Sequence, residues 1–383
     1  MTKLCVGMVT CWYKNISMAN YVFNLKQALE KRGTLVQIIT SNCICEHAYH
    51  GESEIFQGEC RLVCQPLIPF MKITGKRLGH PVLRIIHSIF QTIRGIRYLA
   101  KCGDCHIIHY HQSSPFSFGG FPLLPLLLIP TPQKKIVTIH NFDQIIMSPR
   151  LQILNNMYKH ADMIIVHSKE QKKRTIKLGI PKHRIKVIPH GAQRVEELGS
   201  KRKRITFFGA PMKRKGFFTL VKALEILKSS GVKINLEIYG IYGTNEKNNA
   251  IKEAKKLGVD ELLSWYGKLS EHEFDEKMQE SMFTFAVYPK PIAGSSIITR
   301  AMINGTPVIA SNVGGSKEYL EDAGIFVPPN DPQALASAIQ KLADNKTLRE
   351  KMGQEARKRA KTLLSWDNIA KETFRTYLEV VGK

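Results

Sequence analysis

An alternation of strand-like and helix-like segments runs through this chain and restarts once, and it constrains the fold more than any other feature. Short apolar runs typical of buried strands alternate with longer amphipathic stretches typical of helices. In the first half we predict strands at 4–10, 35–40, 107–110, 135–139, 163–166 and 185–191, and a first helix at 19–32. In the second half we predict strands at 205–209, 235–239, 263–266, 283–288, 308–310 and 324–327, and a helix at 217–230. Such alternation predicts α/β architecture, with parallel sheets covered by helices on both faces.

The restart predicts two domains. The 383 residues are too many for one ordinary domain and fit two of about 150–200 residues each. The basic stretch Lys201–Arg204 is interpreted as a linker. We therefore predict a Rossmann-like domain over 1–195, a second over 196–365, and an amphipathic terminal helix over 366–383, with a cleft between the domains. The first strand lacks a following G-x-G-x-x-G, which argues against a dinucleotide oxidoreductase.

The formal net charge of +24 favours an anionic neighbour: lipid headgroups, phosphorylated substrates or nucleic acid. The alternative is a solvated basic surface. Segment 82–99 is amphipathic and basic, which predicts either a helix on an anionic membrane surface or a core-facing helix with solvated arginines. No nucleic-acid motif or aromatic-rich platform is present, so no nucleic-acid partner is expected.

The start of the chain and its most apolar run bear on localisation. Met1 leads directly into a predicted strand, without a signal peptide. The run 121–130 is broken by prolines and is too short to span about 30 Å of hydrocarbon. We expect a cytoplasmic protein, or one bound peripherally to the inner face of the membrane.

All eight cysteines precede residue 106. The pairs Cys43–Cys45 and Cys102–Cys105, with His47 and His50 nearby, raise the possibility of a zinc site. However, the first pair follows a strand and the second precedes one, which places them at opposite ends of a parallel sheet. Reduced, unpaired thiols and no metal site are therefore favoured.

A basic turn follows the first strand of the second half. Gly209 ends the strand, and Lys213, Arg214 and Lys215 precede a helix. Helix N-termini attract phosphate through free N–H groups, and the cations add full charges. The turn is predicted to bind phosphate; the alternative is an ordinary solvated turn.

Two further segments have polar residues at predicted strand or helix ends. Gly294, Ser295 and Ser296 open a helix and either bind phosphate or form an ordinary N-cap. His140 follows the strand 135–139 and is predicted to point into the cleft; the alternative is a structural histidine.

The segment Ala301–Ser311, followed by Asn312–Glu318, closely resembles the nucleotide-sugar site of the retaining glycosyltransferases with the GT-B fold. This family includes the phosphatidylinositol mannosyltransferases. The resemblance extends over nearly the whole chain. It is most specific in Lys215-Gly216, Tyr266-Gly267, Gly305-Thr306-Pro307 and Gly314-Gly315 with Glu318.

The resemblance implies roles for particular residues. It implies that His140 lies beside the transferred sugar and positions sugar and acceptor, that Asn15 and Ser17 belong to an acceptor and phosphate loop, and that the terminal helix crosses back onto the first domain. The implied donor-binding residues are Gly209, Lys213, Arg214, Lys215, Tyr266, Gly267, Lys268, Gly294, Ser295, Ser296, Arg300 and Glu318.

The sequence departs from the family pattern at several polar positions. The two glutamates of the usual E-x7-E motif are absent: Arg300 replaces the ribose-binding one, and Ile292 or Ala293 the other. Ala210 replaces a phosphate-binding arginine. A guanidinium only donates hydrogen bonds, so Arg300 suits an anionic donor group or a nearby acid such as Glu318.

Taken together, the sequence predicts a hexosyltransferase that uses a nucleotide-sugar donor and a lipid-linked or polysaccharide acceptor. Retention of configuration is implied by the resemblance alone. No cofactor beyond the nucleotide-sugar co-substrate, and no divalent metal, is expected. The alternative is a catalytically silent GT-B protein that acts as partner or chaperone of an active glycosyltransferase.

Overall fold

A computed structural model describes residues 3–10, 16–41, 60–64, 105–112, 127–140, 156–192, 202–291 and 295–382. For 16–19, 39–41 and 60–64 only the backbone is considered. The predictions for helix 82–99, Cys43–Cys45, Cys102, Asn15 and Gly294 lie outside the described residues. The chain divides into two compact units, 1–189 with 366–383, and 190–365.

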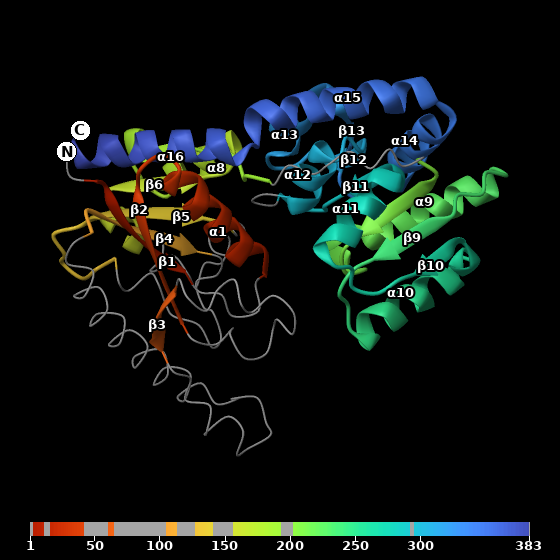
Figure 1. Cartoon of the computed structure of the whole chain (residues 1–383). Coiled ribbons are helices and arrows are strands. Elements are labelled where there is room, and N and C mark those ends of the chain that lie inside the picture. Colours follow the sequence, from red (N-terminus) through yellow and green to blue (C-terminus); the bar gives the residue numbers. More distant parts are fainter. Residues whose placement is uncertain are drawn as a thin grey trace, which may run out of the picture. The chain divides into compact units, whose positions relative to one another are not determined.

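The first unit contains a parallel sheet of seven described strands in the order β3-β2-β1-β4-β5-β6-β7. The strands are β1 Cys5–Thr10, β2 Leu35–Ser41, β3 Cys60–Cys64, β4 Ile107–Gln112, β5 Lys134–Ile139, β6 Met163–Val166 and β7 Ile185–Val187. Helix α1 (Ile16–Glu30) and the terminal helix α16 (Trp366–Val381) pack against each other and share one apolar core with the sheet (Figure 1). Helix α8 (Lys169–Lys177) follows β6.

The second unit contains a parallel sheet of six described strands in the order β10-β9-β8-β11-β12-β13. The strands are β8 Arg204–Phe208, β9 Leu236–Tyr239, β10 Leu263–Trp265, β11 Ser281–Ala286, β12 Val308–Ser311 and β13 Gly324–Val327. One apolar core joins the sheet to α9 Phe217–Ser229, α10 Thr244–Lys256 and α14 Pro332–Asp344. A second core joins it to α11 Glu271–Glu280, α12 Ser296–Ile303, α13 Ser316–Leu320 and α15 Lys346–Leu363 (Figure 1).

These two sheets confirm the predicted α/β class, and most predicted strands agree with the observed ones to within two residues. The strand predicted over 185–191 is too long: β7 ends at Val187, and Pro189 lacks the N–H that a further ladder bond requires. Strand β3 was not predicted. Among the helices described, none has the length and apolarity needed to cross a bilayer.

Candidate functional site

Three glycines, Gly209, Gly240 and Gly267, lie next to one another at the carboxyl ends of β8, β9 and β10. We call them the glycine strip. The N–H of Gly209 donates to Tyr239 O at 2.7 Å, and the N–H of Gly240 donates to Gly267 O at 3.1 Å. A Cβ on Gly240 would lie 2.9 Å from the Gly209 carbonyl carbon, so only glycine permits this approach. Lys268, which follows Gly267 in the sequence, is exposed. Open α/β sheets bind ligands at this edge.

The predicted basic turn is the 3-10 segment Lys213–Lys215, followed by Gly216 and helix α9. Gly216 has φ +74°, and a Cβ there would lie 1.8 Å from Val287 O. The turn is thereby fixed against the end of β11. Its first two side chains are exposed. Lys215 is half-buried, with Nζ 5.2 Å from the ring centroid of Tyr288.

Tyr288 connects this turn to the second predicted phosphate segment. Its hydroxyl lies 2.8 Å from Oγ of Ser295. The same Oγ accepts the N–H of Ile298 at 3.2 Å and caps α12. The structure therefore brings Lys215, Tyr288 and Ser295 together, although Tyr288 was not singled out from the sequence. Its signal was its position at the end of the predicted strand 283–288.

Arg300 is neutralised by helix α11. Its Nη1 lies 2.7 Å from Glu271 Oε2, and its Nη2 lies 2.8 Å from Asp275 Oδ1. The guanidinium also covers the ring of Phe274, with its carbon 3.9 Å from the centroid. The proposed pairing of Arg300 with Glu318 is wrong, because the arginine faces α11 and finds both its acids there.

A row of aromatic rings crosses the same sheet and ends at Arg300. Tyr266 stacks on Tyr239 at 4.8 Å between centroids, and Tyr239 stacks on Phe208 at 5.5 Å. Phe208 contacts Phe274 at 4.6 Å. Tyr266, at the free end of the row, is 41% exposed. Because Tyr239 and Phe208 are buried, Tyr266 is the ring of this row that remains accessible beside the glycine strip.

The remaining predicted residues are spread over both units. Ser296 is the first residue of α12. Glu318 lies in α13, where its carbonyl accepts a hydrogen bond from Arg359 at 3.1 Å. Ser17 lies in the first turn of α1, whereas Asn15 and Gly294 fall outside the described residues.

His140, the predicted catalytic residue, lies among other histidines of the first unit. Its Nε2 is 3.2 Å from His111 Nδ1, and its Nδ1 is 3.2 Å from His167 Nε2. Tyr21 of α1 meets its ring edge-on at 4.6 Å. Burial lowers the pKa of neighbouring His109 to about 3. Burial, with the charges of His109 and His167, lowers the pKa of His111 well below its usual value.

Two buried cysteines of the first unit lie close together: the sulfurs of Cys5 and Cys105 are 3.1 Å apart. Within the described ranges, no group of three or more His, Cys, Asp or Glu residues is arranged to hold a metal ion.

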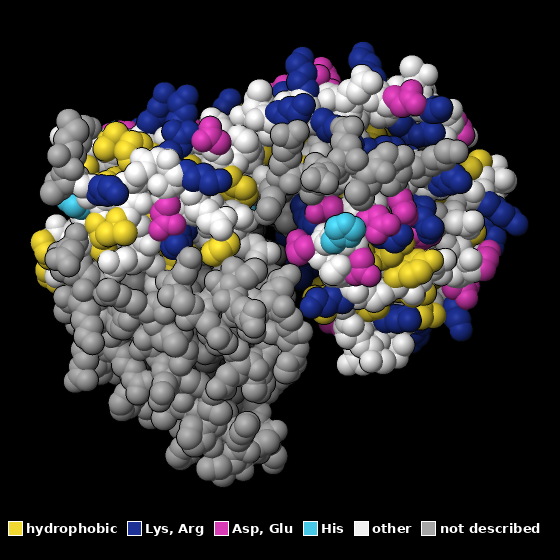
Figure 2. Space-filling model, viewed as in Figure 1, with side chains coloured by type: hydrophobic (Ala, Val, Ile, Leu, Met, Phe, Trp, Pro, Cys, Tyr) yellow, Lys and Arg dark blue, Asp and Glu magenta, His cyan; other side chains and the backbone are white. Residues whose placement is uncertain are grey.

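On the face shown in Figure 2, the Lys and Arg side chains of the described residues lie among Asp and Glu.

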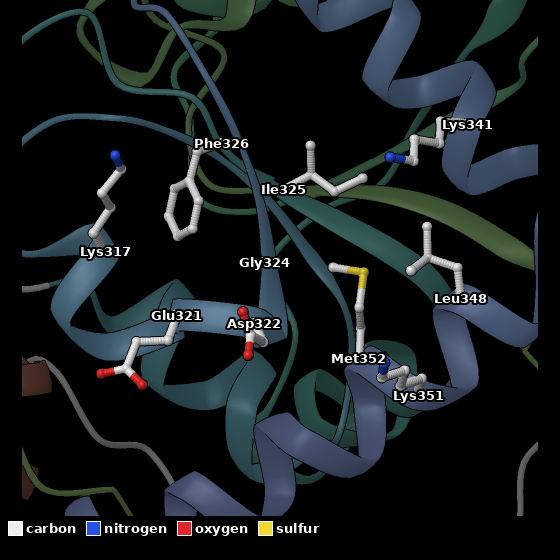
Figure 3. A pocket seen from close by; sticks show the side chains of 10 residues that line it. All are labelled: Lys317, Glu321, Asp322, Gly324, Ile325, Phe326, Lys341, Leu348, Lys351 and Met352. Carbon is white, nitrogen blue, oxygen red and sulfur yellow. The ribbon is translucent and has the colours of Figure 1, made fainter.

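A hollow of about 720 Å³ lies at the edge strand β13 (Figure 3). Figure 3 shows Lys317 and Phe326 on one side of the strand, and Ile325, Lys341 and Met352 on the other. None of the predicted donor-binding residues lines it. The hollow is therefore distinct from the candidate site at the carboxyl ends of the strands.

Comparison with known proteins identifies the family. The model described as Glycosyltransferase Family 4 matches residues 18–194, and the one described as Glycosyl transferases group 1 matches residues 192–359. The chain therefore belongs to the group 1 glycosyltransferases with the GT-B fold.

Individual relatives agree with this assignment. An uncharacterized glycosyltransferase of Methanocaldococcus jannaschii is 30% identical over 47% of this chain and 47% of its own length. The capsular polysaccharide biosynthesis glycosyltransferase CapM of Staphylococcus aureus is 25% identical over 46% of each chain. In these matches the chain spans about half the length of the curated relatives.

Solved structures share the fold over almost the whole chain. Sucrose-phosphate synthase of Thermosynechococcus elongatus has a TM-score of 0.75 at 19% identity, covering 99% of this chain and 100% of its own. HepE of Anabaena, in complex with UDP, has a TM-score of 0.72 at 14% identity, covering 99% of this chain and 100% of its own.

Proposed function

We propose that this chain moves a hexose-type sugar from a nucleoside diphosphate sugar to a lipid-linked or polysaccharide acceptor, with retention of configuration and without a divalent metal. The observation that carries the proposal is the convergence of Lys215, Tyr288 and Ser295 at the carboxyl edge of the second sheet. Membership of the glycosyltransferase family supports it. The UDP and UDP-glucose complexes of HepE support this class of donor.

In this proposal the donor lies along the glycine strip. The diphosphate meets Lys215, whose ammonium group forms charge-assisted hydrogen bonds with phosphate oxygens. The base stacks on the exposed ring of Tyr266, since an aromatic face binds any planar base with little dependence on which base it is. We assign to His140 the role of positioning the sugar for attack by the acceptor hydroxyl, and the leaving diphosphate takes the acceptor's proton.

A second candidate is a silent GT-B protein that partners an active glycosyltransferase. The observation that favours it is the state of Arg300. At the position of the family's ribose-binding carboxylate stands a guanidinium, already neutralised by Glu271 and Asp275. It cannot accept hydrogen bonds from a ribose.

Calorimetry and a transfer assay separate the two candidates. Lys215→Ala should weaken binding of nucleoside diphosphates by about 1–3 kcal/mol, as expected for a charge-assisted contact. Lys222→Ala, an exposed lysine on the following helix α9, is the matched control and should leave affinity unchanged. Transfer from a donor panel to lipid extract that depends on Lys215 would eliminate the silent candidate. Folded protein that binds no donor and transfers no sugar would establish it.

A further inference from the structure

Three histidines from neighbouring strands form a hydrogen-bonded chain in the first unit. His111 lies in β4, and His140 and His167 directly follow β5 and β6, which are adjacent in the sheet. Successive rings approach nitrogen to nitrogen at 3.2 Å. The chain ends where Nδ1 of His167 lies 2.9 Å from the carbonyl oxygen of Ile188.

The carbonyl oxygen of Ile188 sets the direction of each hydrogen bond among the three histidines. A carbonyl oxygen only accepts, so Nδ1 of His167 carries a proton, and its Nε2 accepts if the ring is neutral. Nδ1 of His140 must then donate to His167, and Nε2 of His140 must accept from Nδ1 of His111. All three neutral rings are therefore in the same tautomer, with the proton on Nδ1.

The surroundings favour the neutral state. His111 and His167 are buried, and Nε2 of His111 has no hydrogen-bond partner in the described part of the chain. A proton added there would be a buried donor without an acceptor, which is costly. Tyr21 of α1 and these two histidines face His140. His109 stacks behind His111 at 4.1 Å. A positive charge on one of these imidazoles would oppose protonation of the next, because like charges repel.

We propose that His111 and His167 are positioning residues that hold His140 neutral, with its proton on Nδ1. Only the kinetic consequence rests on the proposed function. Retaining glycosyl transfer passes through an oxocarbenium-like state, whose positive charge an adjacent imidazolium would repel. A neutral His140 avoids that repulsion.

A metal site is the main competing interpretation of clustered histidines. Metal ligation requires that several nitrogen lone pairs converge on one point. Here the nitrogens of His111, His140 and His167 are aligned in donor–acceptor pairs, and the described residues contain no group suited to a metal ion.

Nuclear magnetic resonance of the full chain, labelled with ¹⁵N-histidine, tests the charge state and tautomer of His140 without any activity assay. His140→Gln assigns the His140 signals, and His183→Gln, at an exposed histidine of the same unit, is the control. We expect His140 to be neutral with the proton on Nδ1, and not to titrate between pH 8 and pH 5.5. A proton on Nε2, titration near the ordinary pKa of about 6.5, or zinc binding that His140→Gln abolishes would each overturn the proposal.

Kinetic measurements test whether the hydrogen bonds from His111 and His167 to His140 contribute to sugar transfer. His111→Leu and His167→Leu should lower kcat about 10–100-fold, as losses of supporting hydrogen bonds do, and change the donor KM less than about twofold. They should also move the acid limb of the kcat profile up to about pH 6.5. His111→Asn and His167→Gln place an amide where the bonding nitrogen was, and should restore kcat to within about threefold. Leucine variants that fold but keep wild-type kcat and pH profile would overturn the positioning role. A wild type with the expected tautomer but no transfer from any donor would instead contradict the proposed function.

Discussion

At the scale of single residues, Gly216 fixes the basic turn of the proposed donor site. Gly216→Ala would place a methyl group 1.8 Å from Val287 O at a φ of +74°. We expect a loss of about 2–5 kcal/mol in the free energy of unfolding, the sum of a left-handed conformation and a steric clash, together with weaker donor binding. The control is Gly231→Ala, with φ +80° and open space around it. It should cost only the conformational part, about 1–2 kcal/mol. Urea denaturation measures both, and equal losses would show that contact with Val287 does not matter.

Arg300 is held by opposite charges, so reversing its charge should cost stability. Arg300→Glu would put a third carboxylate beside Glu271 and Asp275. We expect the free energy of unfolding at pH 7 to fall by about 1–3 kcal/mol. Adding Asp275→Asn should recover part of that loss, because it removes one of the repelling charges. If Arg300→Glu were as stable as wild type, the ion pairs seen here would contribute nothing to folding.

The partners of Arg300 show where prediction from the sequence ended. Its donor-only chemistry predicted an acid, and an acid is present. The choice of Glu318 failed because proximity along the chain says nothing about which helix lies beside α12. Glu271 and Asp275 precede Arg300 by more than twenty residues and meet it only because α11 and α12 pack on the same face of the sheet.

At the scale of elements, most strands and the helices α1, α9 and α16 followed from the sequence, but β3 and the order of the strands in the sheets did not. Apolar runs bounded by turn residues located β1, β6 and β8, because burial on both faces leaves a clear pattern. The aromatic row and the histidine chain depend on which strands are neighbours. His140 was found because it ends a strand; His111 and His167 occupy equivalent positions, and knowledge of the strand order would have revealed them.

The buried histidines of β4 should make stability depend on pH. Below about pH 6.5 the unfolded chain takes up protons, whereas folded His109 does so only near pH 3. Protons therefore favour unfolding, and the free energy of unfolding should fall as pH drops through this window. The greatest slope is about 1.4 kcal/mol per pH unit for each such histidine. Urea titrations at pH 7, 6 and 5 measure it. His109→Gln should reduce the slope and exposed His183→Gln should not; a wild-type stability independent of pH would contradict the prediction.

At the scale of the whole molecule, the proposed donor site does not explain the positive net charge. The net charge is +24, far more than one diphosphate requires. On the face in Figure 2 the described cations are mixed with acids, which disperses their field. The segment 82–99 concentrates basic residues on an amphipathic stretch, so it is the proposed membrane contact.

Vesicle binding tests this proposal. The whole chain should cosediment with anionic vesicles at low salt and be released at higher ionic strength, because each cation near an anionic surface contributes about 1 kcal/mol and is screened by salt. Replacing Arg84, Arg94 and Arg97 by Gln should weaken binding by about 3 kcal/mol on the same basis. The matched control replaces Lys252, Lys255 and Lys256, all exposed on α10, by Gln. It removes the same charge from a site outside the proposed contact, so binding should remain near that of the wild type.

If both triple variants lost binding equally, net charge alone would account for vesicle binding, and 82–99 would not be a membrane helix. If the wild type sedimented no better with anionic than with neutral vesicles at low salt, membrane association itself would be excluded, and the acceptor would have to reach the enzyme from solution.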